Sequence, residues 1–206
     1  MGEQTESAWQ LLERLREGAL PQQPDVLLRY QPWLKLLVRL QIETQFQGKF
    51  SDSDIVQQTL LEACRDLPKF RGQTEAELLA WLRQILAHVL AHEIRRYHGT
   101  HQRDLRREVS LEDALAQSSR RLGDMLALTG SSPSAKAEQR EQELILADVL
   151  ATLSDDHREV IILRNLEGLS HEDVAERMQR SVGAVRMLWV RALADLRTAM
   201  AVINTR

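Results

Sequence analysis

The stretch Gly168–Arg197, GLSHEDVAERMQRSVGAVRMLWVRALADLR, decides the fold of the second half of the chain. Ser170 can cap a helix, and Asp173 three residues later can return the hydrogen bond, which is the pattern of a capping box. Ser181 can cap the helix that follows. Because only two residues separate the two helices, they must cross sharply. This spacing predicts a helix-turn-helix, whose second helix can enter a major groove of DNA.

The second of these helices has two different faces. Residues such as Val185 and Leu196 recur at helical spacing and are expected to be buried, while an arginine on the opposite face can discriminate guanine by about 1–3 kcal/mol. That opposite face carries Arg186, Met187, Val190 and Arg191. An ordinary helical hairpin with a solvated arginine face is the alternative interpretation.

The turn between the two helices departs from the usual pattern at Gln179, where glycine is favoured. A left-handed backbone there would cost a residue with a side chain about 1–2 kcal/mol. This departure counts against a helix-turn-helix.

Composition favours an all-α fold in a chain of 206 residues. Leu occurs 34 times, against 29 for Val, Ile and Thr together, and Leu suits helices whereas the branched residues suit strands. An all-β fold is therefore excluded. No membrane-spanning stretch or secretory signal is evident, and a single cysteine suits a reducing compartment. A cytoplasmic location without membrane insertion is expected.

Charge is distributed unevenly, although the formal net charge is only −3. Residues 141–176 hold ten acidic residues and two arginines, whereas residues 177–206 hold six arginines and one acidic residue. Residues 95–107 form a second basic segment, with five arginines and one acidic residue. Because affinity for phosphates grows with the number of cations presented together, each segment could contact DNA, but the whole molecule should bind it weakly unaided.

Hydrophobic spacing predicts two small helical domains joined by a polar linker. The first domain should contain a helix over 25–45, bent or begun near Pro32, a helix from about 52 to 67, and one capped by Thr74 that runs to about Tyr97. The expected divisions are an N-terminal helical extension at 1–24 with a helix over 5–18, a first domain at 25–98, a linker at 99–140 with some helix around 111–128, and the helix-turn-helix domain at 141–200.

The second half of the chain resembles the fourth conserved region of bacterial RNA polymerase sigma factors of the extracytoplasmic-function (ECF) group. The matching residues are LSDDHREVIILR at 153–164, LEGLS at 166–170, VAE at 174–176 and RAL at 191–193. The first half is similar to their second region, through DIVQQTLLE at 54–62, FRG at 70–72, AWLRQI at 80–85 and the arginine pair at 95–96. The order and spacing of the two sets of motifs, taken together, are specific to this group of sigma factors.

The resemblance implies a promoter-specificity subunit without catalytic chemistry of its own. Its implied partners are core RNA polymerase, through the clamp helices of the large subunit, promoter DNA and, as is usual in the family, an anti-sigma factor. The implied polymerase-binding face is Asp54, Gln57, Gln58, Leu61, Glu62 and Arg65, which helical spacing places together. A plain solvated surface is the alternative for this face.

The resemblance also implies two DNA contacts. The residues expected near the −10 element are Lys69, Phe70, Arg71, Arg83, His88, Arg95 and Arg96. Phe70 and Trp81 offer rings that could stack on bases, although packing is the favoured interpretation for Trp81. Those expected at the −35 element are Ser181, Val182, Arg186, Met187, Val190 and Arg191.

Other functions find little support in the sequence. His88 and His92 have a spacing that can bind zinc, but no third ligand is evident, so neither a metal nor another cofactor is expected. No phosphate-binding loop or nucleophile motif appears, which argues against an enzyme. The main alternative is a helix-turn-helix regulator that binds operators without polymerase, and a protein-binding helical adaptor is a third class.

Overall fold

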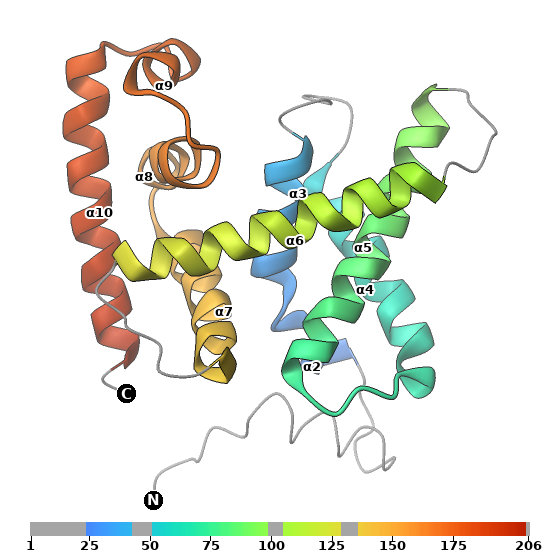
Figure 1. Cartoon of the computed structure of the whole chain (residues 1–206). Coiled ribbons are helices and arrows are strands. Elements are labelled where there is room, and N and C mark those ends of the chain that lie inside the picture. The colour runs from blue at the N-terminus through green and yellow to red at the C-terminus, as the bar shows by residue number, and fades with distance from the viewer. Residues whose placement is uncertain (1–23, 43–50, 99–104, 129–135, 205–206) are drawn as a thin grey trace, which may run out of the picture. The chain divides into compact units, whose positions relative to one another are not determined.

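A computed structural model describes residues 24–42, 51–98, 105–128 and 136–204. The elements in these ranges are all helical (Figure 1), which confirms the predicted all-α class. The chain divides into two compact units, residues 1–116 and 117–206. The helix predicted over 5–18 lies outside the described residues.

The first unit is built around helix α4 (Asp52–Asp66), which packs on α3 (Gln31–Ile42), α5 (Glu75–His98) and the short α2 (Pro24–Leu28). The break between α2 and α3 confirms the prediction that a helix begins near Pro32, since proline is tolerated in the first turn. The fully buried core residues are mainly leucines, together with Tyr30 and Trp33.

Helix α5 begins with the cap that the sequence predicts. The Glu77 amide donates to Thr74 Oγ1 at 3.2 Å, and the Thr74 amide donates to Glu77 Oε2 at 3.0 Å. Helix α4 differs, because Ser51 makes no side-chain cap hydrogen bond. The acidic residues Asp52 and Asp54 in its first turn still oppose the positive end of the helix dipole. A 3₁₀ turn, η1 (Leu67–Lys69), follows α4 at Pro68.

The second unit contains α7 (Lys136–Thr152), α8 (Asp155–Ile161), the π-helical turn η2 (Ile162–Leu166), α9 (His171–Arg177) and α10 (Val182–Asn204). Helix α10 packs on α7, α8 and α9. Its contact side is buried at Val185, Ala192 and Leu196, each with no exposed surface. The hydrophobic spacing of the sequence thus forms a single core for this unit.

The range predicted as a linker is more helical than expected. Helix α6 (Leu105–Leu128) runs beyond the predicted 111–128, and α7 already begins at Lys136. The division between the units, after Ala116, falls inside α6. The polar composition that suggested a linker is rich in good helix formers, and Leu115 and Leu122 of α6 are fully buried.

No helix among the described residues is long and apolar enough to cross a membrane.

Candidate nucleic-acid interface

The predicted helix-turn-helix is present, with α9 and α10 joined through Met178–Ser181. The Asp173 amide donates to Ser170 Oγ at 3.0 Å, and the Ser170 amide donates to Asp173 Oδ2 at 3.2 Å. The Ser170 hydroxyl, which donates to Asp173 Oδ2 at 2.6 Å, and the Ser170 amide together hold the pKa of Asp173 below its usual value. At the start of α10, the Ala184 amide donates to Ser181 Oγ at 3.2 Å. Both predicted caps are therefore confirmed.

Gln179 has a φ of 53°, the only positive φ of a non-glycine residue in the described ranges. The turn therefore forms with a non-glycine residue in the left-handed conformation, although Gln179 counted against the motif in the sequence. Local hydrogen bonds hold it, since the Gln179 amide donates to the Glu176 carbonyl at 3.1 Å and the Arg180 amide donates to the Ala175 carbonyl at 2.9 Å. The strained turn therefore fixes how α10 leaves α9.

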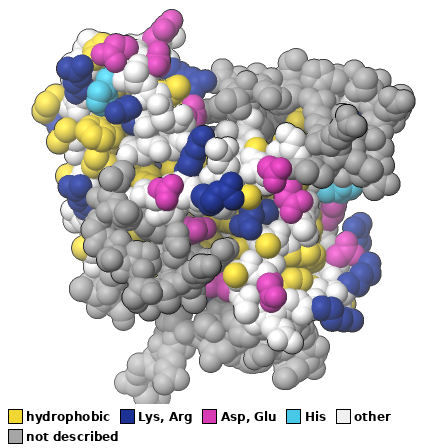
Figure 2. All heavy atoms as spheres, in the orientation of Figure 1, with side chains coloured by type: hydrophobic (Ala, Val, Ile, Leu, Met, Phe, Trp, Pro, Cys, Tyr) yellow, Lys and Arg dark blue, Asp and Glu magenta, His cyan; other side chains and the backbone are white. Residues whose placement is uncertain are grey.

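The outer face of α10 presents the side chains expected at the −35 element. Met187 and Val190 are 56% and 55% exposed, and Arg186 and Arg191 flank them at the surface. Val182 is half-buried, and Ser181 is exposed and used as the cap. Figure 2 shows hydrophobic and basic side chains mixed on this part of the surface. An exposed apolar pair beside arginines suits thymine methyl groups as well as guanine edges.

Three arginines of the motif are paired with carboxylates. Arg177 lies 2.7 Å from Glu167. The other two pairs are Arg180 with Asp156 at 2.7 Å and Arg186 with Glu172 at 3.5 Å. Exposed pairs of this kind contribute little to stability. They offset part of the positive charge of this motif.

An aromatic cluster around Trp189 was not predicted from the sequence. Trp189 Nε1 donates to Asn165 Oδ1 at 3.0 Å, and the His171 ring meets the Trp189 ring edge-on with centroids 5.5 Å apart. The Arg164 guanidinium lies 5.9 Å from the centre of the Trp189 ring. Burial lowers the pKa of His171, and the charges of Arg164 and Arg186 lower it further. The sequence feature that could have revealed this cluster is the tryptophan between Arg186 and Arg191.

The residues expected near the −10 element are partly occupied by local contacts. Phe70 is 8% exposed and stacks on Trp81, with ring centroids 4.8 Å apart. Lys69 pairs with Asp66 at 2.7 Å, and Arg71 donates to the Pro68 carbonyl at 2.8 Å. The Phe70 ring, which could stack on a base, is thus packed against Trp81. Its role in base stacking stays a prediction.

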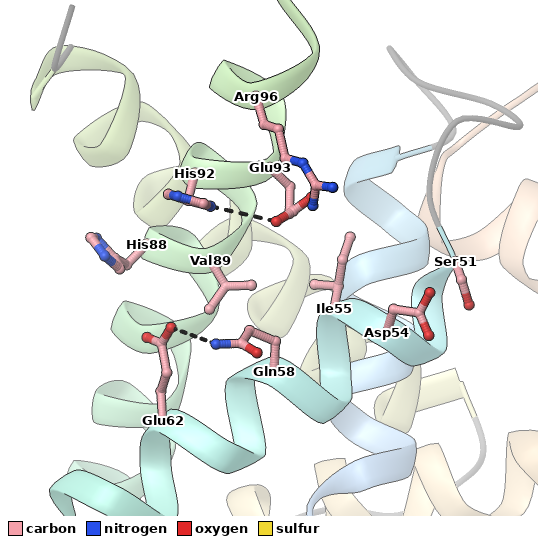
Figure 3. Close-up of a pocket in the computed structure, with 10 residues that line it drawn as sticks. All are labelled: Ser51, Asp54, Ile55, Gln58, Glu62, His88, Val89, His92, Glu93 and Arg96. Atoms are coloured by element: carbon pink, nitrogen blue, oxygen red, sulfur yellow. Dashed lines mark hydrogen bonds and ion pairs between the residues drawn. The ribbon is translucent and has the colours of Figure 1, made fainter. Parts of the chain in front are cut away.

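A groove of about 660 Å³ between α4 and α5 brings together members of two predicted sets (Figure 3). Its polar lining from α4 is Asp54, Gln58 and Glu62, with Gln58 Nε2 donating to Glu62 Oε1 at 3.0 Å. Its lining from α5 includes His88 and Arg96. The expected polymerase-binding and −10 residues are therefore neighbours.

The other members of the two sets lie outside this groove lining. Gln57, Leu61 and Arg65 are exposed on α4, with Leu61 at 65%. Arg83 and Arg95 are half-buried on α5. Within the described ranges, His88 and His92 are not part of any group of three side chains able to hold a metal ion.

Comparison with known proteins places these features in a family. Residues 149–198, which include α9 and most of α10, match the model of sigma-70 region 4. The ECF RNA polymerase sigma-E factor of Haemophilus influenzae is 30% identical over 200 residues, covering 88% of this chain and 89% of that protein. The RNA polymerase sigma-H factor of Pseudomonas aeruginosa is 30% identical over 184 residues, covering 89% of this chain and 88% of that protein.

A solved structure of a sigma factor with an anti-sigma factor from Bartonella quintana matches with a TM-score of 0.32 and 23% identity, over 85% of this chain and 94% of that one. The two sequence relatives span nearly the whole chain, and they do not favour an operator-binding regulator. The chain belongs to the ECF group of bacterial RNA polymerase sigma factors.

Proposed function

We propose that this sigma factor binds core RNA polymerase through the exposed face of α4 and reads the −35 element through the outer face of α10. The chain directs polymerase to specific promoters and aids their opening at the −10 element. It works without catalytic chemistry of its own, in the cytoplasm. An anti-sigma factor is a further partner, as is usual in this family.

One observation carries the −35 assignment: α10 is divided sharply into two sides. Val185, Ala192 and Leu196 have no exposed surface, whereas Met187 and Val190 are more than half exposed. A helix that is anchored along one side and preceded by a tight turn presents its other side to a major groove. The match to sigma-70 region 4 covers this same segment.

The polymerase-binding assignment is supported by the acidic and polar character of the α4 face. Asp54 is exposed, and Glu62 lines the same groove two helical turns further along α4. Leu61 is 65% exposed. It forms an apolar centre on this face, and polar residues surround it. Protein interfaces commonly have this arrangement, and carboxylates at such a site select a basic partner surface.

Two double variants, each with its own control, test the two assignments separately. The Asp54→Asn/Glu62→Gln variant should weaken binding to purified core polymerase by at least about tenfold, since close charge pairs across interfaces contribute more than about 1.4 kcal/mol. Its charge-matched control is Asp113→Asn/Asp124→Asn, which removes two exposed carboxylates from α6. Retained core affinity in the Asp54→Asn/Glu62→Gln variant would contradict the α4 assignment.

The Arg186→Ala/Arg191→Ala variant should bind core polymerase normally and lose promoter selection, by about tenfold or more for each lost guanine contact. The matched control is Arg120→Ala, an exposed arginine on α6. A variant that transcribes the same promoters as the unaltered chain would contradict the α10 assignment.

A further inference from the structure

Trp189 lies among the residues proposed to face DNA, yet its indole N–H is directed to Asn165 within the unit. It comes one helical turn after Arg186 and directly before Val190. Unlike these exposed neighbours it is half-buried, and its indole Nε1 donates to Asn165 Oδ1 at 3.0 Å. This hydrogen bond joins α10 to η2, a segment that precedes the helix-turn-helix.

Asn165 is presented to Trp189 by the π-helical turn. The Glu167 amide donates to the Ile162 carbonyl at 2.9 Å, five residues back, which widens the turn at this point. Leu163 and Leu166 anchor η2 in the core, with 0% and 1% exposure. Asn165 is therefore fixed to the rigid part of the unit, and π-helical turns of this kind are frequent at functional sites.

The apolar contacts of α10 fix its rotation less closely than this hydrogen bond, and its ion pairs Asp195–His157 at 2.8 Å and Arg186–Glu172 at 3.5 Å involve carboxylates that are more than half exposed. The anchoring residues Val185, Ala192 and Leu196 are fully buried, but apolar burial has no preferred direction. A hydrogen bond weakens steeply when its angle departs from linearity. The Asn165–Trp189 bond thus resists a roll of α10 about its own axis, and such a roll would displace Arg186 and Arg191 together.

We infer that Asn165 and Trp189 are positioning residues for promoter reading, whose hydrogen bond sets the rotation of α10 and so the register of Arg186 and Arg191 on the −35 element. This inference rests on the proposed role of α10. His171 and Arg164 hold the Trp189 ring in place, and neither Asn165 nor Trp189 needs to touch DNA.

The test uses holoenzyme formed from the full chain and core polymerase, acting on one promoter fragment whose −35 element is randomised. Each −35 sequence is linked to its own barcode in the transcribed region, so that sequencing the transcripts gives the preference for the best −35 sequence over each single substitution. Trp189→Phe keeps the ring but removes the N–H donor, and Asn165→Ala removes the acceptor. Each should lower that preference about fivefold, the value of one hydrogen bond. The double variant should lose no more than either single one.

Two controls distinguish positioning from general weakening. Asn165→Asp keeps an acceptor oxygen and should retain the preference of the unaltered chain. Thr198→Ala removes a hydrogen bond elsewhere on α10, from Thr198 Oγ1 to the Ala194 carbonyl at 2.9 Å, and should leave the preference unchanged. Independent losses that multiply in the double variant, or an unchanged preference in both single variants, would overturn the inference.

The hydrogen bond can also be observed directly in solution. The chain has four tryptophans, so its ¹H–¹⁵N spectrum should show four indole signals, of which Trp189→Phe removes and identifies one. That signal should shift in Asn165→Ala, and a signal that does not move would overturn the inference. If the unaltered holoenzyme shows no preference at −35 while its Trp189 signal responds to Asn165→Ala, the proposed role of α10 is wrong, and the positioning role falls with it.

Discussion

Phe70 and Trp81 stack with ring centroids 4.8 Å apart and their planes inclined by 29°. Gly72 closes the other side of the pair, because a Cβ atom at this glycine would lie 2.3 Å from Phe70 Cζ and 2.9 Å from Glu77 Cβ. The Phe70 ring is therefore held between Trp81 and the backbone at Gly72, in the segment expected to reach the −10 element.

Gly72→Ala should displace the Phe70 ring from Trp81. Overpacking of this kind costs about 1–3 kcal/mol, so the free energy of unfolding should fall by that amount in a urea titration. Permanganate reactivity of −10 thymines in the holoenzyme complex should fall as well if this segment holds the separated strand. An unfolding free energy equal to that of the unaltered chain would show that the ring moves freely.

The effect of a substitution at Gln179 on stability should depend on how easily the new residue adopts the positive φ of 53°. A glycine at this position would adopt the same backbone without steric cost, whereas valine is among the residues least able to do so. The free energy of unfolding should therefore be highest for Gln179→Gly, by up to about 1 kcal/mol, and lowest for Gln179→Val. Equal stability of the Val variant and the unaltered chain would mean that the turn relaxes to another conformation.

Alanine substitutions at two glycines with open surroundings should change the free energy of unfolding in opposite directions. No atom lies within 4 Å of a Cβ built at Gly168 or Gly183, but Gly168 has a φ of +76°. Gly168→Ala should lower the free energy of unfolding by about 1–2 kcal/mol. Gly183→Ala, within α10, should raise it by about 0.4–1 kcal/mol. Thermal unfolding of the two full-length variants checks the signs, and a shared sign would contradict this account.

Acid should destabilise the second unit through His171. Its pKa in the folded chain is lowered by burial and by Arg164 and Arg186, against an opposing effect of Glu172. The folded state then binds fewer protons than the unfolded state, so this contribution to stability is complete above about pH 6.5 and decreases as pH falls toward the folded pKa. The unaltered chain should lose more unfolding free energy than His171→Gln between about pH 7.5 and 5.5. Equal losses would exclude His171 as the group responsible.

The sequence predicts well those features that depend on residues close together in the chain. The Ser170–Asp173 capping box and the Ser181 cap are local, so residue type and spacing are enough to anticipate them. The division of α10 into a buried and an exposed side follows from its helical period. These local features are what identified the helix-turn-helix.

Features that depend on distant residues could not be predicted in the same way. Asn165 and Trp189 are 24 residues apart, and only the π-helical turn brings their side chains together. The contact between Phe70 and Trp81 likewise depends on the path of the chain at Gly72. The groove joins His88 of α5 to Glu62 of α4, whereas the sequence assigned those residues to two different partners.

The most direct test of the central claim is transcription in vitro with purified core polymerase and a genomic promoter library, with and without this protein. The account predicts discrete new start sites that appear only with the protein and disappear with Arg186→Ala/Arg191→Ala. The absence of core binding, together with tight binding of the protein alone to operator DNA, would contradict it.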